Sequence, residues 1–97
     1  GQEISIALLP VLPTAFTPNG DGENDVFLIR GGPFTDVDFK IYNNWGELIF
    51  SSIDANDGWD GTYKGQNAPL GVYTWTFIVE IAGDRIFNQS GDVTLMR

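Results

Sequence analysis

Two reactive residue types are missing from the 97-residue sequence, which has no cysteine and no histidine. Without cysteine the chain has no disulfide, no thiolate nucleophile and no cysteine-ligated zinc. Without histidine it cannot build a Ser-His-Asp triad or the usual zinc centres. Only carboxylate, lysine or tyrosine chemistry remains, and no nucleophile–base pair can be assembled from it, so we expect no catalytic residues.

Basic residues and long apolar runs are also scarce. Five Lys and Arg stand against 13 Asp and Glu, a formal net charge of -8. This charge repels nucleic-acid phosphates and anionic lipid surfaces, so neither partner is expected. The longest apolar runs are far shorter than the roughly 20 residues that a membrane-spanning helix needs, which argues against membrane insertion.

The residues that are present indicate one folded domain over residues 1–97. Apolar residues make up 42% of the chain and aromatic residues 13%, enough for a core of ordinary size. Twelve glycines and five prolines recur every few residues and would interrupt any long helix. We therefore expect almost no helix.

Alternation of apolar and polar residues dominates the sequence. In residues 36–43, Val37, Phe39 and Ile41 would share one face of a half-buried strand. The same pattern predicts strands over 25–31, 46–52, 71–81, 84–90 and 92–97, with shorter ones at 4–9, 13–16 and 61–64. About seven short strands separated by turns predict an all-β fold, an immunoglobulin-like antiparallel β-sandwich.

The strand predicted over 71–81 has one aromatic-rich face, which we expect to lie in the core because a sheet must bury one of its faces. An exposed aromatic row that stacks on sugars is the alternative. The residues of this face are Tyr73, Trp75, Phe77, Val79 and Ile81.

Two tryptophans lie in predicted turns. Trp45 belongs to the segment Asn43-Asn44-Trp45-Gly46, which predicts a tight hairpin. We expect its ring to fold back over the end of the sandwich, with a ligand-stacking platform as the alternative. Trp59 lies between two Asp-Gly steps and is expected to plug one end of the core.

Two acidic sets have both a chemical and a structural interpretation. Asp57 and Asp60 would suit glycosidase-like acid–base catalysis, but aspartates beside glycine are ordinary turn residues, and we favour that interpretation. In the segment 19–25, oxygen ligands recur at every second residue, as in calcium loops, although an EF-hand is excluded because Asn24 and Arg30 occupy its sixth and twelfth positions. A turn is favoured there, with no cofactor, and calcium is the alternative. The predicted calcium ligands are Asn19, Asp21, Glu23 and Asp25.

Four motifs follow one another along the chain: PTAFTPNGDGENDVF, FKIYNNWGELIF, GWDGTYKGQNAPLGVYTWTF and GDVTLMR. In this order they resemble the gliding-motility-associated C-terminal domain of Bacteroidetes, the type B sorting domain of the type IX secretion system. The similarity runs from about residue 12 to Arg97. Residues 1–11 lie outside it and form either a linker or a first strand.

The resemblance implies a non-catalytic C-terminal domain that directs an N-terminal passenger protein through the type IX secretion machinery. It implies a periplasmic stage, followed by the cell surface or the medium. Family members commonly have arginine where this chain has Asn44, just before the tryptophan of the turn. The residues expected to be recognised by the translocon are Asn43, Trp45, Gly46, Trp59, Gly61, Thr94, Leu95, Met96 and Arg97.

Two further expectations remain. The closing segment 91–97 would lie on an edge or near-edge strand that ends in a cation, and such an edge is available for strand addition by the secretion apparatus. The alternative function is a carbohydrate-binding or adhesive module of a surface protein, in which Trp45 and Trp59 stack on sugar rings.

Overall fold

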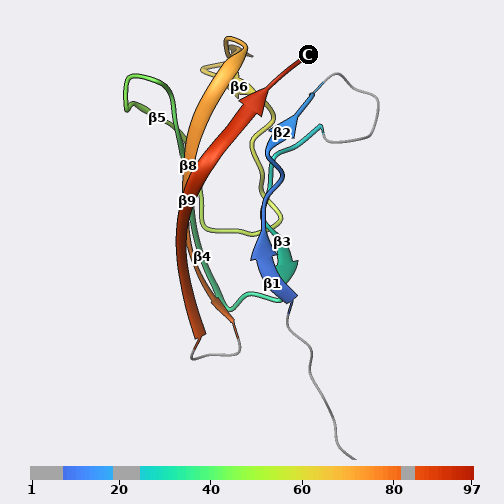
Figure 1. Ribbon diagram of the computed structural model, residues 1–97, viewed down its shortest axis with the longest axis vertical. Helices are drawn as coiled ribbons and strands as arrows, with labels where there is room; N and C mark the ends of the chain where they lie inside the picture. The colour runs from blue at the N-terminus through green and yellow to red at the C-terminus, as the bar shows by residue number, and fades with distance from the viewer. Residues whose placement is uncertain (1–7, 19–24, 82–84) are drawn as a thin grey trace, which may run out of the picture.

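The computed structural model describes residues 8–18, 25–81 and 85–97 (Figure 1). Within these ranges the chain forms strands and loops and no helix, so the predicted all-β class is confirmed. Nine strands occur there in place of the predicted seven, because several are only two or three residues long. They are β1 Leu8–Val11, β2 Ala15–Phe16, β3 Arg30–Gly32, β4 Asp36–Tyr42, β5 Leu48–Ser52, β6 Thr62–Tyr63, β7 Gln66–Asn67, β8 Gly71–Ile81 and β9 Arg85–Leu95.

The larger layer is a five-stranded sheet of order β2-β9-β8-β4-β5. Its neighbours are antiparallel, except that β2 runs parallel to β9. The two long strands, β8 and β9, pair without a register break from Gly71↔Leu95 to Ile81↔Arg85.

The prediction of two separate strands over 84–90 and 92–97 is wrong, because β9 runs through Gly91 without a break. Glycine normally weakens a strand because it has no side chain to pack. Here the Trp75 ring of β8 fills that place: a Cβ atom on Gly91 would lie only 2.7 Å from Trp75 Cζ2. The aromatic ring of the neighbouring strand therefore packs where the glycine offers no side chain, and the ladder continues.

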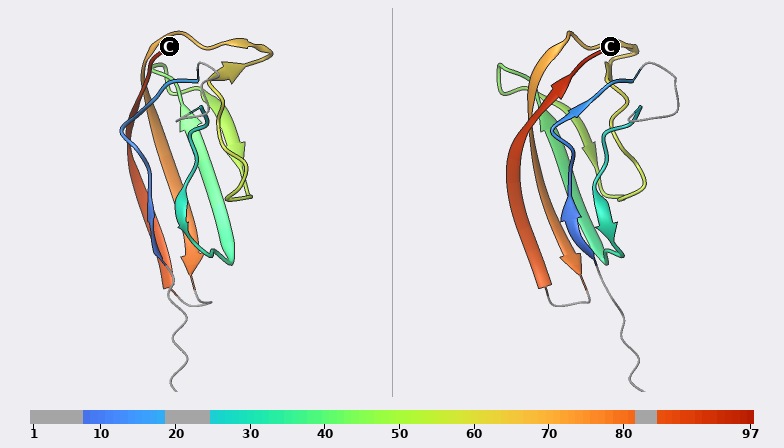
Figure 2. Two further views of the ribbon diagram at one scale, coloured as in Figure 1. Left: turned by 90° about the vertical axis from the view of Figure 1, so that its right-hand side faces the viewer. Right: turned by 45° about the vertical axis from the view of Figure 1, so that its right-hand side comes forward.

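The second layer is sparser. β1 pairs with β3, β6 pairs with β7, and Phe27 forms an isolated bridge with Trp59. The predicted strand over 25–31 is therefore mostly wrong, since only its end belongs to β3, yet Phe27 and Ile29 still point into the core as the alternation indicated. The chain changes layers between β1 and β2, as Figure 2 shows.

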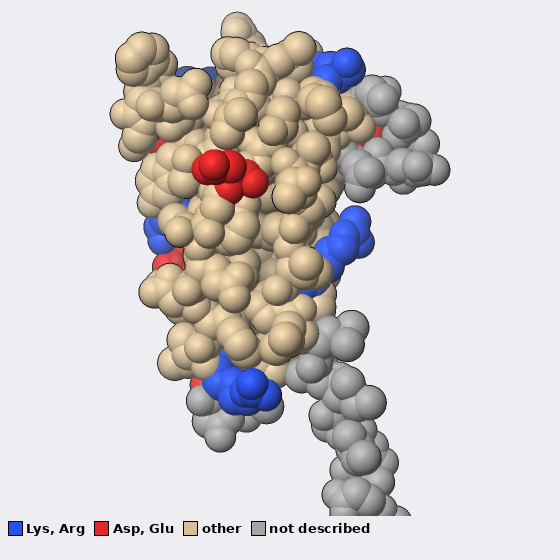
Figure 3. Space-filling view, viewed as in Figure 1, with Lys and Arg blue, Asp and Glu red and all other residues tan. Residues whose placement is uncertain are grey.

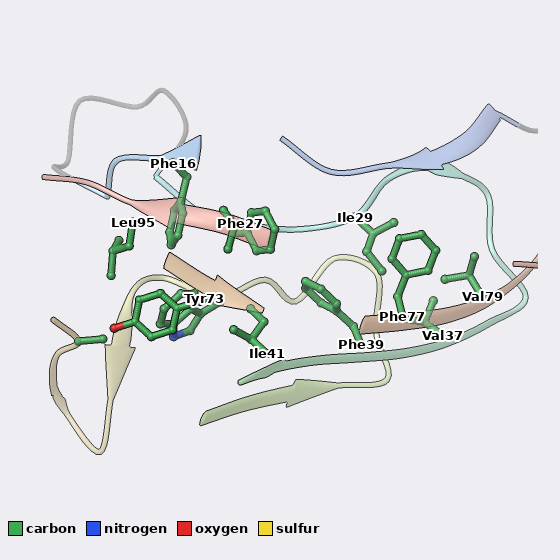
Figure 4. Packing of buried hydrophobic residues seen from close by; sticks show 13 residues of the cluster. Phe16, Phe27, Ile29, Val37, Phe39, Ile41, Tyr73, Phe77, Val79 and Leu95 are labelled. Atoms are coloured by element: carbon green, nitrogen blue, oxygen red, sulfur yellow. The ribbon is translucent and has the colours of Figure 1, made fainter. Parts of the chain in front are cut away.

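Side chains from both layers meet in one aromatic-rich core (Figure 4). The Phe27 ring lies 5.5 Å from Phe16 and 5.9 Å from Phe39, measured between ring centroids. Each fully buried side chain of this size contributes about 1.5–3 kcal/mol. The predicted inward face of β4 is confirmed, because its odd-numbered residues Val37, Phe39 and Ile41 are all buried.

The aromatic face of β8 also lies in the core as predicted, with Tyr73 and Phe77 buried and Trp75 half-buried. The Tyr73 hydroxyl donates to the Pro69 carbonyl, 2.5 Å away and four residues upstream. This is the tyrosine-corner arrangement found in immunoglobulin-like domains. The fold is thus an all-β sandwich with one full and one reduced layer.

Candidate functional site

One end of the sandwich brings together most of the residues predicted to be recognised, which lie on three segments. The β4–β5 turn, the segment around β6 and β7, and the end of β9 all lie at the top of the molecule in Figures 1 and 2. The first two segments line a common cavity, and Arg97 joins the third to the second. We call this region, residues 43–47, 61–71 and 94–97, the Trp45 end.

The β4–β5 hairpin, predicted from its turn residues, is confirmed. The Asn43 side-chain oxygen accepts hydrogen bonds from the backbone N–H groups of Trp45, at 2.9 Å, and Glu47, at 3.0 Å. Gly46 has a φ of +78°, a conformation that favours glycine. The Tyr63 hydroxyl donates to the Glu47 carboxylate at 3.0 Å, which fastens the turn to the next segment.

Trp45 stands at the tip of this turn and is 90% exposed. The expectation that its ring folds back over the sandwich end is therefore wrong. The hydrogen bonds of Asn43 fix the turn in a shape that carries the indole outward, a geometry that residue types alone do not specify. Tryptophan is among the residue types that are enriched at binding hot spots, so an exposed indole on a fixed turn is a candidate contact for a partner.

A cavity of about 180 Å³ opens beside Trp45. Its lining is mixed: Ile49, Pro69 and Leu70 are apolar, while Asn43 and Asn44 contribute polar groups. Small-molecule sites usually measure about 300–1,000 Å³. The cavity is therefore sized for a single side chain of a partner rather than for a whole ligand.

Trp59 is 1% exposed and plugs the core as predicted. Its ring lies edge-on to Tyr73, with centroids 4.9 Å apart, and its Nε1–H donates to the Thr62 carbonyl at 2.8 Å. A partner of the folded domain cannot touch this ring. The sugar-stacking pair of Trp45 and Trp59 is therefore wrong, because only Trp45 is accessible.

The Arg97 side chain forms hydrogen bonds with the backbone of the domain. Its guanidinium donates to the Ala68 carbonyl at 2.8 Å and to the Gly61 carbonyl at 2.7 Å. Gly61 has a φ of +85°, and a Cβ atom there would lie 2.9 Å from Pro18 Cγ and 3.1 Å from Arg97 Nη2. Glycine at position 61 thus makes room for the arginine. This contact was not predictable from the sequence, because no residue pattern pairs a cation at position 97 with backbone carbonyls.

The segment that ends β9 is not a bare edge. Thr94 and Leu95 pair with β2 on one side and with β8 on the other, and Leu95 is buried. The sequence predicted strand addition at these residues. That prediction is wrong for Thr94 and Leu95, because β2 already occupies this edge. Met96, 45% exposed, is the neighbouring residue that a partner can reach.

Asp57 and Asp60 act as turn residues, which is the interpretation favoured from the sequence. The Asp60 carboxylate accepts hydrogen bonds from the Thr62 backbone N–H, at 3.0 Å, and from its hydroxyl, at 2.6 Å. The Asp57 carboxylate lies 3.4 Å from the hydroxyl of Ser52, which donates to it. Each carboxylate thus has a local structural partner.

Burial raises the pKa of the Tyr73 hydroxyl, while the nearby Arg97 guanidinium acts to lower it. The net shift is upward, so the phenol keeps its proton at neutral pH and remains a donor to Pro69. This hydrogen bond is lost only when the pH rises through the raised pKa.

Three of the four predicted calcium ligands, Asn19, Asp21 and Glu23, lie outside the described residues, while Asp25 lies within them. Among the residues that the structure does describe, no group of three or more potential ligands gathers to hold a metal. The calcium hypothesis therefore stays a prediction.

Titration with calcium tests it. If the loop binds the ion, calcium at about 100 times the dissociation constant would stabilise the fold by about 2.7 kcal/mol and raise the melting temperature. Differential scanning calorimetry of the wild type and of Asp21→Asn, with magnesium in parallel, makes the measurement. An unchanged melting temperature at millimolar calcium would remove the metal site.

Comparison with known proteins assigns most of the chain to one family. A family model described as the CHU_C type IX secretion signal domain matches residues 11–95. The searches of curated proteins and of solved structures gave no match. In the described part of the chain, no helix is long and apolar enough to cross a membrane.

Proposed function

The chain belongs to the CHU_C type IX secretion signal domain family, and we propose that the Trp45 end is the surface that the secretion machinery recognises. The domain acts as a sorting signal for type IX secretion, and this signal directs export to the cell surface or the medium. What the proposal adds is the place of contact, a periplasmic stage before export, and an N-terminal passenger as the cargo.

The exposure of Trp45 carries the proposal. Its indole is 90% exposed on a turn fixed by Asn43, and a cavity sized for one side chain lies beside it. Leu70, at the rim of this cavity, is 62% exposed. A few aromatic anchors and the small pockets that accept partner side chains carry most of the binding energy at protein interfaces, and this surface offers one of each.

The residues predicted to be recognised fall into two groups. Asn43, Trp45, Gly46, Thr94, Met96 and Arg97 are at least partly accessible, so a partner can contact them directly. Trp59, Gly61 and Leu95 are buried and would act only by holding the first group in place. We also propose that the domain performs no reaction of its own, because the sequence contains neither cysteine nor histidine and the carboxylates of Asp57 and Asp60 hydrogen-bond to local turn residues.

Replacing Trp45 with alanine tests the proposal. A fluorescent protein carrying the domain at its C-terminus is produced in a bacterium with a type IX secretion system, and fluorescence outside the cells is measured. Loss of a hot-spot tryptophan should weaken recognition by about 30-fold, equivalent to about 2 kcal/mol, and leave the protein inside. Folding should be nearly unchanged, because the ring is exposed.

Ile53→Ala is the control. Ile53 is 85% exposed but follows β5 at the opposite end of the sandwich, so its truncation should leave secretion intact. Normal secretion of the Trp45→Ala fusion would show that the machinery recognises another part of the domain.

A further inference from the structure

β9 is paired on both flanks for only part of its length. Its inner flank pairs with β8 at every residue. On its outer flank, β2 pairs with Thr94 and Leu95, and the described residues supply no other strand there. Within the part of the chain that the structure describes, β9 is therefore an edge strand from Arg85 to about Asp92.

The hydrogen bonds between β9 and the β2 segment show which backbone groups of β9 face outward. The N–H of Thr94 donates to the Thr14 carbonyl at 2.9 Å, and the N–H of Met96 donates to the Phe16 carbonyl at 3.0 Å. Backbone groups alternate sides along a strand, so the other even-numbered residues of β9 point the same way. These residues are Ile86, Asn88, Ser90 and Asp92.

At one end of this row, the outward carbonyl of Asp92 already has a partner, the indole of Trp75. The indole crosses over Gly91, and its Nε1–H donates to the Asp92 carbonyl at 3.3 Å. Below that point, Ile86, Asn88 and Ser90 have no outward backbone partner among the described residues. The open stretch of about five residues matches the usual length of one strand.

Between the exposed charges of Arg85 and Asp92, residues 86–90 lack the features that normally prevent pairing with other chains. Such features are charged side chains, proline, bulges and short length. β9 has an unbroken register over its full 11 residues, and the surface over β9 and β1 is mostly uncharged (Figure 3). The opposite edge strand, β5, is shorter and has a register irregularity beside Tyr42.

We propose that residues 86–90 of β9 accept an extended segment of a partner protein, which adds to the sheet as a further strand next to β2. β2 already occupies the continuation of the same edge, so the site extends an existing pairing. A row of alternating N–H and C=O groups is complemented by another strand. An inward side chain near Gly91 would pack on the half-buried Trp75 ring, so that side chain should be apolar.

The proposal rests on the sorting function, because the partner is a component of the secretion machinery. An acidic segment is disfavoured by the net charge of -8. The site is separate from the Trp45 end, which holds the other accessible contacts.

Amide hydrogen exchange on the isolated chain tests whether the edge is open. The N–H groups of Ile86, Asn88 and Ser90 should exchange at least tenfold faster than those of Phe87 and Gln89, which bond to β8. Equal protection of the two sets would mean that the edge is covered and would overturn the proposal.

Proline substitution tests strand addition in the secretion assay. Ser90→Pro removes an outward N–H and blocks a new strand. Ser51→Pro is the matched control at the other edge of the sheet. Ser51 lies opposite Lys40, and the even-numbered residues of β4, including Lys40, direct their backbone groups toward β8. The Ser51 N–H therefore points away from β4 and beyond the edge of the sheet, as the Ser90 N–H does at the β9 edge. Ser90→Pro should reduce secreted fluorescence about tenfold, whereas Ser51→Pro should not.

The outcomes are distinct. Normal secretion of Ser90→Pro, or equal loss with Ser51→Pro at matched melting temperatures, would refute the edge site. If Ser90→Pro does not fold, Gln89→Lys serves instead, because it adds a charge at an exposed position of this edge. Gln89→Lys should reduce secretion by the same factor, and normal secretion of this variant would also refute the site. Self-association of the wild type that Ser90→Pro abolishes would make a second copy the occupant. No secretion of the wild-type fusion would instead contradict the proposed function.

Discussion

Trp59→Ala is expected to destabilise the domain by about 3–5 kcal/mol, the cost of removing a large aromatic side chain from a closed core. Trp59 is 1% exposed and packs on Phe16 and Tyr73, with centroids 5.4 and 4.9 Å away. It also bridges to Phe27 through reciprocal backbone hydrogen bonds of 2.8 and 2.9 Å. Small domains have only about 5–15 kcal/mol of stability, so much of the total would be lost.

Thermal unfolding followed by circular dichroism measures the effect. At about 4–8 °C per kcal/mol, the melting temperature should fall by more than about 12 °C. Trp45→Ala is the matched control, because it removes the same side chain from a position that is 90% exposed. If both variants melted within 2–3 °C of the wild type, a span of about 0.5 kcal/mol, the Trp59 ring would not be part of the core.

The strands that form the core were largely predictable, because the signal for each lies within its own sequence. In β4 and β8 one face is buried and the other is exposed, so hydrophobicity alternates with period two along each strand. The pattern failed where a strand contact came from another element. β9 continues through Gly91 only because Trp75 of β8 covers it, and Phe27 pairs only with Trp59, which lies far away in sequence.

The candidate site was predicted less completely than the fold. Residue types indicated the hairpin at Asn43 and the burial of Trp59, because both depend on local propensity and hydrophobicity. The outward direction of Trp45 depends on the Asn43 side chain, and the role of Arg97 depends on two carbonyls more than 25 residues away. Periodicity carries no information about such contacts.

Arg97→Ala is expected to destabilise the domain by about 2 kcal/mol. The guanidinium donates two charge-assisted hydrogen bonds, to the carbonyls of Gly61 and Ala68. Each such bond is worth about 1.5–3 kcal/mol when buried, and the partial exposure of Arg97 reduces the sum. The melting temperature should therefore fall by roughly 8–16 °C. Met96→Ala, a truncation of a neighbouring exposed side chain, should change it little.

Two further measurements separate a structural role of Arg97 from a contact with the translocon. Since the guanidinium lowers the pKa of Tyr73, its removal should raise that pKa further, and ultraviolet titration of the tyrosines detects the change. Arg97→Lys keeps the charge but cannot span two carbonyls with a planar fork, so it should recover only part of the stability. If Arg97→Ala melted like the wild type yet was not secreted, the arginine would act by direct recognition. A parallel loss of stability and secretion, partly restored by lysine in both assays, would show that it acts by holding the Trp45 end together.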